Sequence, residues 1–259
     1  MDYKDILVFL DCSDDNESRL ELAISVCERF GSNLMGVDVS PPQAFENEYA
    51  DRAVRVEALF RGALLQHQIE ASYRVAERRT ASWKDFYAHY ADLVIATQRG
   101  DTSDAFVSKG VPDDIVSSAG VPVLILPSGW KDQTLGESIV LAWNSSREST
   151  RALHDSLPFL RHAKRVTIFE SGRQADDVDS APDLVKAHLC HHGVNSELLT
   201  WPDAGDIDPV NALFACLDRQ DADLIVAGAF GHSKLKESLF GSVSHELLQN
   251  PSIPVLLSH

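Results

Sequence analysis

Residues 228–242, GAFGHSKLKESLFGS, have the residue types and spacing of a phosphate-binding loop. Glycines stand at Gly228, Gly231 and Gly241, and the hydroxyl residue Ser242 follows the last of them. Glycine accepts a left-handed backbone and lets a ligand approach closely, and a serine that caps a helix leaves N–H groups that can hold an anion. The segment therefore predicts an anion site built from backbone donors.

The spacing alone fits ordinary turn and cap glycines equally well. The chain contains none of the motifs G-x-x-x-x-G-K-[ST], G-x-G-x-x-G or G-x-S-x-G, so the P-loop, dinucleotide-binding and nucleophile-elbow patterns are excluded. The sequence on either side of the segment is needed to distinguish a ligand-binding loop from an ordinary turn.

An apolar run, DLIVA at 223–227, precedes the loop, and VSHELLQN at 243–250 follows it with the spacing of a short helix. Across the second half of the chain we expect strands near 139–143, 165–170, 194–200, 224–227 and 255–257, separated by helices. One of these helices begins at Asp208-Pro209, an N-cap and N1 pair, and runs to about Gln220. This alternation is typical of α/β domains with parallel sheets.

The second half repeats the first. Residues 92–126 match residues 223–257 at an offset of 131 until one residue is gained near the end, and residues 5–30 match residues 138–163 at an offset of 133. We therefore predict two tandem doubly wound parallel five-stranded sheets in the order 3-2-1-4-5, with a first domain at 1–128, a linker at 129–137 and a second domain at 138–259. In that order Asn144, after the first strand of the second copy, faces Gly228, after the fourth.

Composition restricts the partners. The 259 residues carry a formal net charge of -16, which disfavours nucleic acid and anionic membrane surfaces. The chain has no long apolar segment, so we expect no membrane span and a cytoplasmic location. Its four cysteines lack C-x-x-C spacing and are interpreted as small buried apolar residues in a reducing compartment.

The loop and the repeats resemble the universal stress protein family, in the form of two UspA-type domains on one chain. The motif G-x-x-G, nine residues, then G-[ST], which this family uses for ATP, is matched by Gly228, Gly231, Gly241 and Ser242. The segments DILVFLDCSDD, AWNSSRESTRAL, GVPVLILP and SIPVLLSH agree as well. The resemblance covers essentially the whole length and implies a Rossmann-like fold.

The resemblance also implies an ATP site, with or without Mg²⁺, in the second copy. The loop after the fourth strand would touch ribose and phosphate, the helix start would hold phosphate oxygens, and backbone groups near Ile168 would read adenine. Many family members have an aspartate where this copy has Asn144, which removes a charge. The expected nucleotide-binding residues are Asn144, Ile168, Gly228, Ala229, Phe230, Gly231, Gly241, Ser242, Val243 and Ser244.

The first copy departs from the family pattern in the loop instead of at the end of the first strand. It keeps Asp11, but Thr97 replaces the first glycine, and Val111-Pro112 replaces Ser242-Val243. Proline removes an N–H donor where phosphate would bind. We therefore expect a degenerate first site that supports the second copy by packing.

The segment HLCHH, residues 188–192, is a second chemical candidate. His188 and His192 stand one helical turn apart with Cys190 between them, a set that would suit zinc or nickel. Histidines near a helix C-terminus are more commonly partners of the helix dipole, so we expect no metal site here.

We favour ATP as a regulatory or structural ligand in a stress response. The alternatives are a slow ATPase or nucleotidyl-transfer enzyme that uses the same crevice, and a ligand-free interaction scaffold. The second copy shows no carboxylate suited to hold a metal for phosphoryl transfer, which favours binding over catalysis. The resemblance further implies that the two domains pair through their last strands within the chain, and it allows a homodimer.

Overall fold

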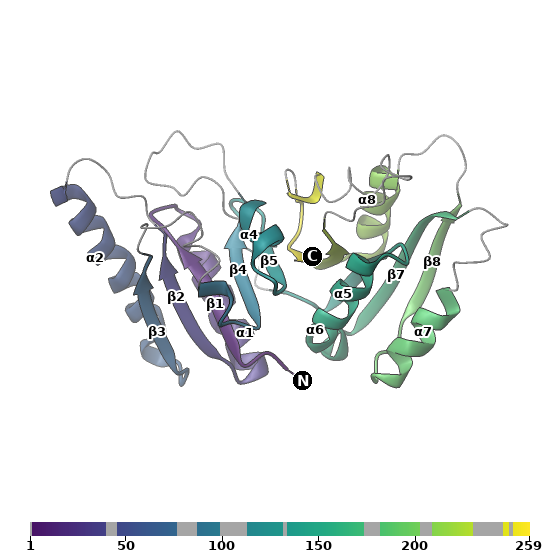
Figure 1. Cartoon of the computed structure of the whole chain (residues 1–259), viewed down its shortest axis with the longest axis horizontal. Helices are drawn as coiled ribbons and strands as arrows, with labels where there is room; N and C mark the ends of the chain where they lie inside the picture. The colour runs from purple at the N-terminus through teal and green to yellow at the C-terminus, as the bar shows by residue number, and fades with distance from the viewer. Residues whose placement is uncertain are drawn as a thin grey trace. The chain divides into compact units, whose positions relative to one another are not determined.

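A computed structural model of the chain divides it into two compact units, Met1–Gln133 and Thr134–His259 (Figure 1). The boundary falls inside the segment that the sequence marks as a linker. The structure describes residues 2–39, 46–76, 87–98, 113–131, 134–173, 182–202, 209–229, 246–248 and 251–259.

The first unit alternates strands with helices. Its elements are β1 (Asp5–Leu10), α1 (Asn16–Phe30), β2 (Asn33–Asp38), α2 (Glu46–Ala63), the short 3-10 helix η1 (Leu64–Gln66), β3 (Ala71–Val75), β4 (Leu93–Thr97), α4 (Asp113–Ser118) and β5 (Val123–Leu126). Its strands run parallel in the order β3-β2-β1-β4-β5.

The second unit repeats this plan. Its elements are β6 (Ser138–Trp143), α5 (Arg147–Asp155), α6 (Leu157–His162), β7 (Arg165–Arg173), α7 (Pro182–His191), β8 (Glu197–Pro202), α8 (Pro209–Gln220), β9 (Leu224–Gly228) and β10 (Val255–Ser258). Its strands are also parallel, in the order β8-β7-β6-β9-β10. The predicted α/β class and strand order 3-2-1-4-5 are confirmed.

Several element boundaries differ from expectation, and β7, expected to end at 170, continues to Arg173. Two other differences have a clear local cause. The strand expected from residue 194 begins at Glu197, because Gly193 has a φ of 79° and Val194 bonds back to Leu189, which prolongs the turn after α7. The helix after β6 is interrupted at Ser156, whose hydroxyl donates to the Leu153 carbonyl at 3.0 Å. Side-chain bonds of this kind compete with helix continuation.

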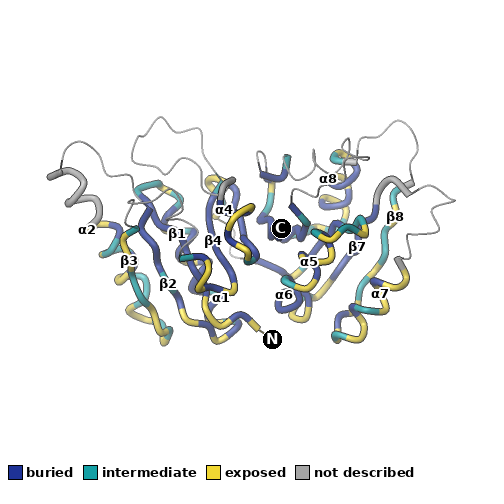
Figure 2. Tube along the Cα trace, viewed as in Figure 1, coloured by how far each residue is buried: buried dark blue, intermediate teal, exposed yellow. Residues whose placement is uncertain are grey.

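The cores follow the central strands (Figure 2). All five residues of β4 are buried, and four of the six in β6 are buried. Such near-continuous apolar runs are typical of parallel strands that helices cover on both faces. No helix in the described part of the chain combines the length and the apolar character needed to cross a membrane.

The cysteines follow the expectation in part. Cys27 and Cys216 are buried, whereas Cys12 is half-buried and Cys190 is exposed. All four are free thiols. The interpretation as small core residues is therefore correct for two of them and wrong for Cys190, which lies on the outer side of α7.

Candidate functional site

Strands β6 and β9 form the point at which the sheet of the second unit changes winding direction. They pair in parallel, with Ile139 opposite Leu224 and Leu141 opposite Val226. Strand order reverses between them, and in open α/β sheets ligands bind outside the carboxyl ends of such strands. Asn144 directly follows β6, and Gly228 is the last residue of β9, so the structure brings these two predicted residues to one edge.

Gly228 is required by close packing. A Cβ added there would lie 2.5 Å from the carbonyl carbon of Glu148 and 2.6 Å from the nitrogen of Ser149, both in the first turn of α5. Gly228 is not among the described glycines with positive φ, so the expected left-handed turn at this position is absent. Strand β9 therefore meets α5 backbone to backbone, which only glycine permits.

Asn144 opens a tight turn into α5. Its side-chain oxygen accepts a bond from the Ser146 nitrogen at 3.1 Å, and Ser145 between them has a φ of 58°. A left-handed conformation is uncommon for a residue with a side chain and is often found at functional sites. The turn leaves the side-chain NH₂ of the half-buried Asn144 without a hydrogen bond to any residue that the structure describes.

The start of α5 lies at the same edge. Ser146 is its N-cap, and the Ser146 hydroxyl accepts from the Ser149 nitrogen at 3.1 Å. The cap orients the helix so that its first turn, and with it the positive end of its dipole, lies against the end of β9. This arrangement favours a polar or anionic group outside the edge.

Of two other predicted residues, Ile168 is buried in the sheet and Ala229 has both backbone groups hydrogen-bonded. Ile168 is fully buried within β7, between Leu141 on β6 and Leu198 on β8. Ala229 donates its nitrogen to the Ser258 carbonyl at 2.8 Å, and its own carbonyl accepts from the His259 ring at 3.0 Å. The backbone of Ala229 thus fastens the end of β9 to the chain end. The remaining predicted residues lie outside the described part: Phe230, Gly231, Gly241, Ser242, Val243 and Ser244.

Sequence reasoning missed a buried carboxylate at this edge. Glu170 lies opposite Trp143 where the β6–β7 ladder ends, and it is 4% exposed. A charged residue closing the apolar run VTIF was the available signal. Glu170 therefore places a buried carboxyl group on the strand next to Asn144.

The corresponding edge of the first unit is built differently. Asp11, the counterpart of Asn144, places Oδ1 3.0 Å from Nη2 of Arg19 on α1. The same oxygen accepts from the Ser13 nitrogen at 3.0 Å and the Ser13 hydroxyl at 2.6 Å. Asp11 is 6% and Arg19 3% exposed. The Asp11 carboxylate is therefore bound by Arg19 and Ser13 within the first unit.

Burial alone would raise the pKa of Asp11, but the Arg19 guanidinium and the bonds from Ser13 outweigh it and hold that pKa below the ordinary value. Asp11 thus stays ionised as half of a closed ion pair. In the second unit Ala152 stands where Arg19 stands in the first. Both members of the pair are replaced by neutral residues, and the edge around Asn144 has neither charge.

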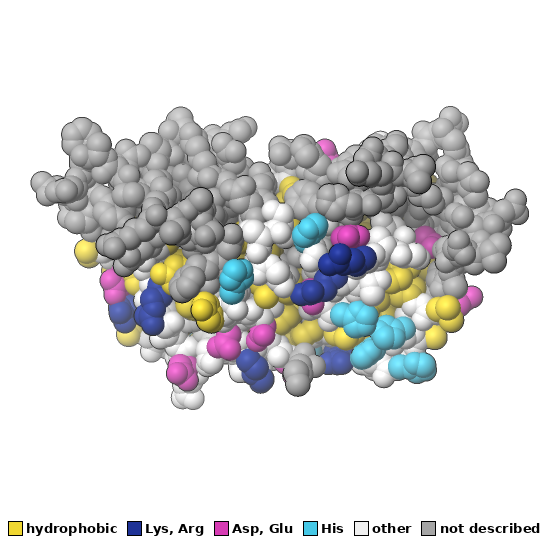
Figure 3. All heavy atoms as spheres, viewed as in Figure 1, with side chains coloured by type: hydrophobic (Ala, Val, Ile, Leu, Met, Phe, Trp, Pro, Cys, Tyr) yellow, Lys and Arg dark blue, Asp and Glu magenta, His cyan; other side chains and the backbone are white. Residues whose placement is uncertain are grey.

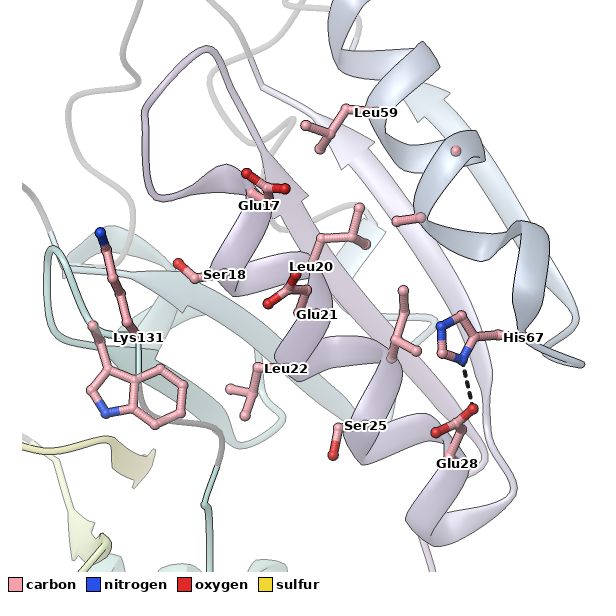
Figure 4. A pocket seen from close by; sticks show the side chains of 14 residues that line it. Glu17, Ser18, Leu20, Glu21, Leu22, Ser25, Glu28, Leu59, His67 and Lys131 are labelled. Carbon is pink, nitrogen blue, oxygen red and sulfur yellow. Dashed lines mark hydrogen bonds and ion pairs between the residues drawn. The ribbon is translucent and has the colours of Figure 1, made fainter.

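A cavity of about 610 Å³ lies along α1 in the first unit (Figure 4). Glu17, Glu21 and Glu28 contribute to its lining, and His67 from the turn after η1 contacts Glu28 at 2.6 Å. Three carboxylates along one wall disfavour an anionic ligand. This cavity is therefore not a candidate for a nucleotide.

The fold and its edges define a two-unit, doubly wound α/β protein. The model of the family described as the universal stress protein family matches residues 203–259, within the second unit. No curated protein sequence matches the chain significantly.

Among solved structures, a universal stress protein from Archaeoglobus fulgidus DSM 4304 is similar with a TM-score of 0.73 at 14% identity, over 98% of this chain and 97% of that one. A functionally unknown protein from Pseudomonas aeruginosa PAO1 is similar with a TM-score of 0.58 at 15% identity, over 99% and 92%. A universal stress protein in complex with cAMP covers 49% of this chain at 19% identity, with a TM-score of 0.37, which supports no inference.

The resemblance to universal stress proteins is thus confirmed. The second unit carries a segment that matches the family model, and the chain has the fold of a universal stress protein over 98% of its length.

Proposed function

We propose that the second unit binds an adenine nucleotide, ATP, at the carboxyl edge between β6 and β9, as a regulatory or structural ligand in a cytoplasmic stress response. One observation carries the proposal: Gly228, the first glycine of the ATP motif, lies at the strand edge beside Asn144 and the capped start of α5. A strand end and a helix start therefore meet where doubly wound folds bind ligands, and the glycine motif continues in the sequence directly from this strand end.

The chemistry of Asn144 favours a ligand with acceptor atoms. Its oxygen is used by the Ser146 nitrogen, and its NH₂ is left to donate. A donor suits a ribose or phosphate oxygen, whereas Mg²⁺ prefers carboxylate or carbonyl oxygens. Asn144 therefore fits the nucleotide itself better than a metal ion that accompanies it.

Asn144, which stands where the first copy has Asp11, removes one negative charge from this edge in an acidic chain, although the buried Glu170 stays there. With a net charge of -16, the protein repels anions at a distance, so affinity has to come from local donors. We propose that Gly231 contributes to the ribose and phosphate contacts, and that Gly241, Ser242, Val243 and Ser244 hold phosphate oxygens through N–H and hydroxyl groups. We propose no second site of this type in the first unit, where Arg19 pairs with Asp11.

Binding is better supported than turnover. Phosphoryl transfer requires charge neutralisation and a positioned metal around the γ-phosphate. Replacement of the strand-end aspartate by Asn144 removes the carboxylate that would serve there. We therefore propose a ligand role rather than an ATPase.

The experiment is native mass spectrometry of the purified full chain, followed by denaturation and identification of any released nucleotide. After removal of bound ligand, calorimetric titration with ATP should give one nucleotide per chain, with an affinity that changes little when Mg²⁺ is omitted. Two nucleotides per chain would contradict the assignment of a closed first edge. No binding would overturn the proposed function.

A further inference from the structure

Three histidines form a cluster on the surface of the second unit, one from α5 and two from the end of α7. His154 lies on α5, His188 on α7, and His192 directly after α7. Their ring centroids are 5.2 Å apart for His154 and His188, 4.7 Å for His188 and His192, and 6.5 Å for His154 and His192. Figure 3 shows histidine side chains gathered on this face of the second unit.

The closest approach has the separation of two ligands on one metal ion. Nε2 of His188 lies 3.3 Å from Nε2 of His154. Two imidazole nitrogens bound to Zn²⁺ at about 2.0–2.1 Å in a tetrahedral arrangement are about 3.3–3.4 Å apart. Without metal this contact is a hydrogen bond between the rings, and with the His154 proton on Nδ1 the donor is Nε2 of His188. Exchange of that one proton for an ion would place both nitrogens at the separation of two ligands, with little movement of α5 against α7.

His154 is also held in the orientation that a metal ligand needs. Its Nδ1 donates to the Thr150 carbonyl at 2.8 Å, one turn earlier on α5. This bond leaves the lone pair on Nε2, the nitrogen that faces His188. Histidine ligands of metals usually make such a bond through the other ring nitrogen, and it fixes both tautomer and ring direction.

His192 is positioned to become the third ligand. In the part of the chain that the structure describes, no three side chains already stand together as a complete metal site, so the His192 ring has to turn toward the other two. Besides its contacts with the other two rings, the His192 ring has one polar contact among the described residues, 3.4 Å between its Nδ1 and Nη2 of Arg161. A contact of that length is weak, and giving it up costs little.

The ligand set differs from the one suggested by sequence spacing. Cys190 lies two residues after His188, which places it about 200° around the helix, and it is exposed. His154, 34 residues earlier in the chain than His188, takes its place. The backbone bond from His192 to the His188 carbonyl, at 3.3 Å, keeps those two residues on the same side of the last turn.

We propose that His154, His188 and His192 bind one divalent transition-metal ion of the zinc type, with solvent in the fourth position, and that the ion joins α5 to α7. Three imidazoles select zinc, nickel or copper over magnesium or calcium, which prefer oxygen ligands. The site is independent of the proposed nucleotide site.

The test is calorimetric titration of the metal-free full chain with ZnCl₂ at neutral pH, with thermal unfolding in parallel. We expect one site per chain and a rise in Tm on addition of zinc. The variants His154→Ala and His188→Ala should each weaken zinc binding at least tenfold and lose the rise in Tm. His154 is exposed and His188 half-buried, and circular dichroism checks that the variants fold.

His191→Ala is the matched control, since His191 is on the same helix and forms none of the three ring pairs of the cluster. It should bind zinc as the parent does, and so should Cys190→Ser. Unchanged affinity in His154→Ala would overturn the proposal. So would loss of binding in Cys190→Ser, which would assign the metal to the thiol, or absence of zinc binding by the parent chain.

Discussion

Arg19 and Asp11 form a buried ion pair in the first unit, with 3.0 Å between Nη2 and Oδ1, and the second unit replaces both residues with neutral ones. Asn16 reinforces the pair by accepting from Arg19 at 2.8 Å. At this strand end the first copy has the buried ion pair of Asp11 and Arg19. The second copy has Asn144, whose side-chain NH₂ makes no hydrogen bond to a described residue. The two copies therefore differ in charge and in hydrogen bonding at this strand end.

Removing one partner of this pair should destabilise the chain strongly. Arg19→Met leaves the buried Asp11 carboxylate without its cation, which typically costs about 3–5 kcal/mol of unfolding free energy. Urea denaturation measures the loss. Arg61→Met is the control, because Arg61 pairs with Glu57 on the surface, where the two side chains are 68% and 41% exposed, and it should cost less than about 1 kcal/mol. Equal effects of the two substitutions would contradict the structural role of Arg19.

The pair should also give the protein a specific sensitivity to acid. The folded-state pKa of Asp11 lies below its ordinary value of 3.8. Its contribution to stability is therefore complete above that value and is lost as pH falls through the folded-state pKa. We expect Asp11→Asn to lower Tm at neutral pH and the difference from the parent to shrink below about pH 4. A difference in Tm that stays constant down to pH 2.5 would argue against an ionised Asp11.

Gly228→Ala should destabilise the second unit by about 1–3 kcal/mol, because the new methyl group would press on the backbone of α5. The nearest atom, the Glu148 carbonyl carbon, is only 2.5 Å from the position of the added carbon. Gly62→Ala is the counterpart in α2, where an added Cβ meets nothing within 4 Å. That substitution should be neutral or stabilising by up to about 1 kcal/mol. Thermal unfolding of both variants tests the difference, and an unaffected Gly228→Ala protein would show that β9 and α5 are less closely packed.

The cysteines should differ in reactivity. Burial raises the pKa of the Cys27 thiol to about 12, with Glu28 adding to the effect, and burial raises that of Cys216 to about 11 although Arg219 opposes it. Both should resist a thiol reagent such as DTNB at pH 8 in the folded protein, because the thiolate is the reactive form. The exposed Cys190 should react first and Cys12 more slowly. Peptide mapping after partial labelling checks the order, and early modification of Cys27 would contradict the burial of α1 against the sheet.

The sequence predicted the arrangement of the strands because hydrophobic runs and the internal repeat are properties of the chain itself. The same reasoning brought Asn144 and Gly228 to one edge correctly. It gave the wrong physical reason for Gly228, since the restriction comes from α5, a contact that exists only after folding. The order of parallel strands follows from short connections and handedness, whereas the exact approach of a helix to a strand does not.

Side-chain partners were harder to foresee for the same reason. Arg19 lies eight residues after Asp11, and the sequence shows an arginine in a helix without showing that it turns inward to the strand end. His154 joins His188 and His192 because the fold brings α5 beside the end of α7. Glu170 could have been noticed as a charge at the end of an apolar run, but its burial depends on the neighbouring strands.

The most direct test of the proposed nucleotide site is calorimetric titration of ATP into the full chain and into two variants related by the repeat, Gly241→Val and Gly110→Val. Gly110 occupies the position in the first copy that Gly241 occupies in the second, at the offset of 131. In the proposed site Gly241 lets phosphate approach the backbone, so we expect Gly241→Val to lose ATP binding and Gly110→Val to bind one ATP per chain as the parent does. Full ATP affinity in Gly241→Val, or loss of binding in Gly110→Val alone, would contradict the placement of the nucleotide in the second unit.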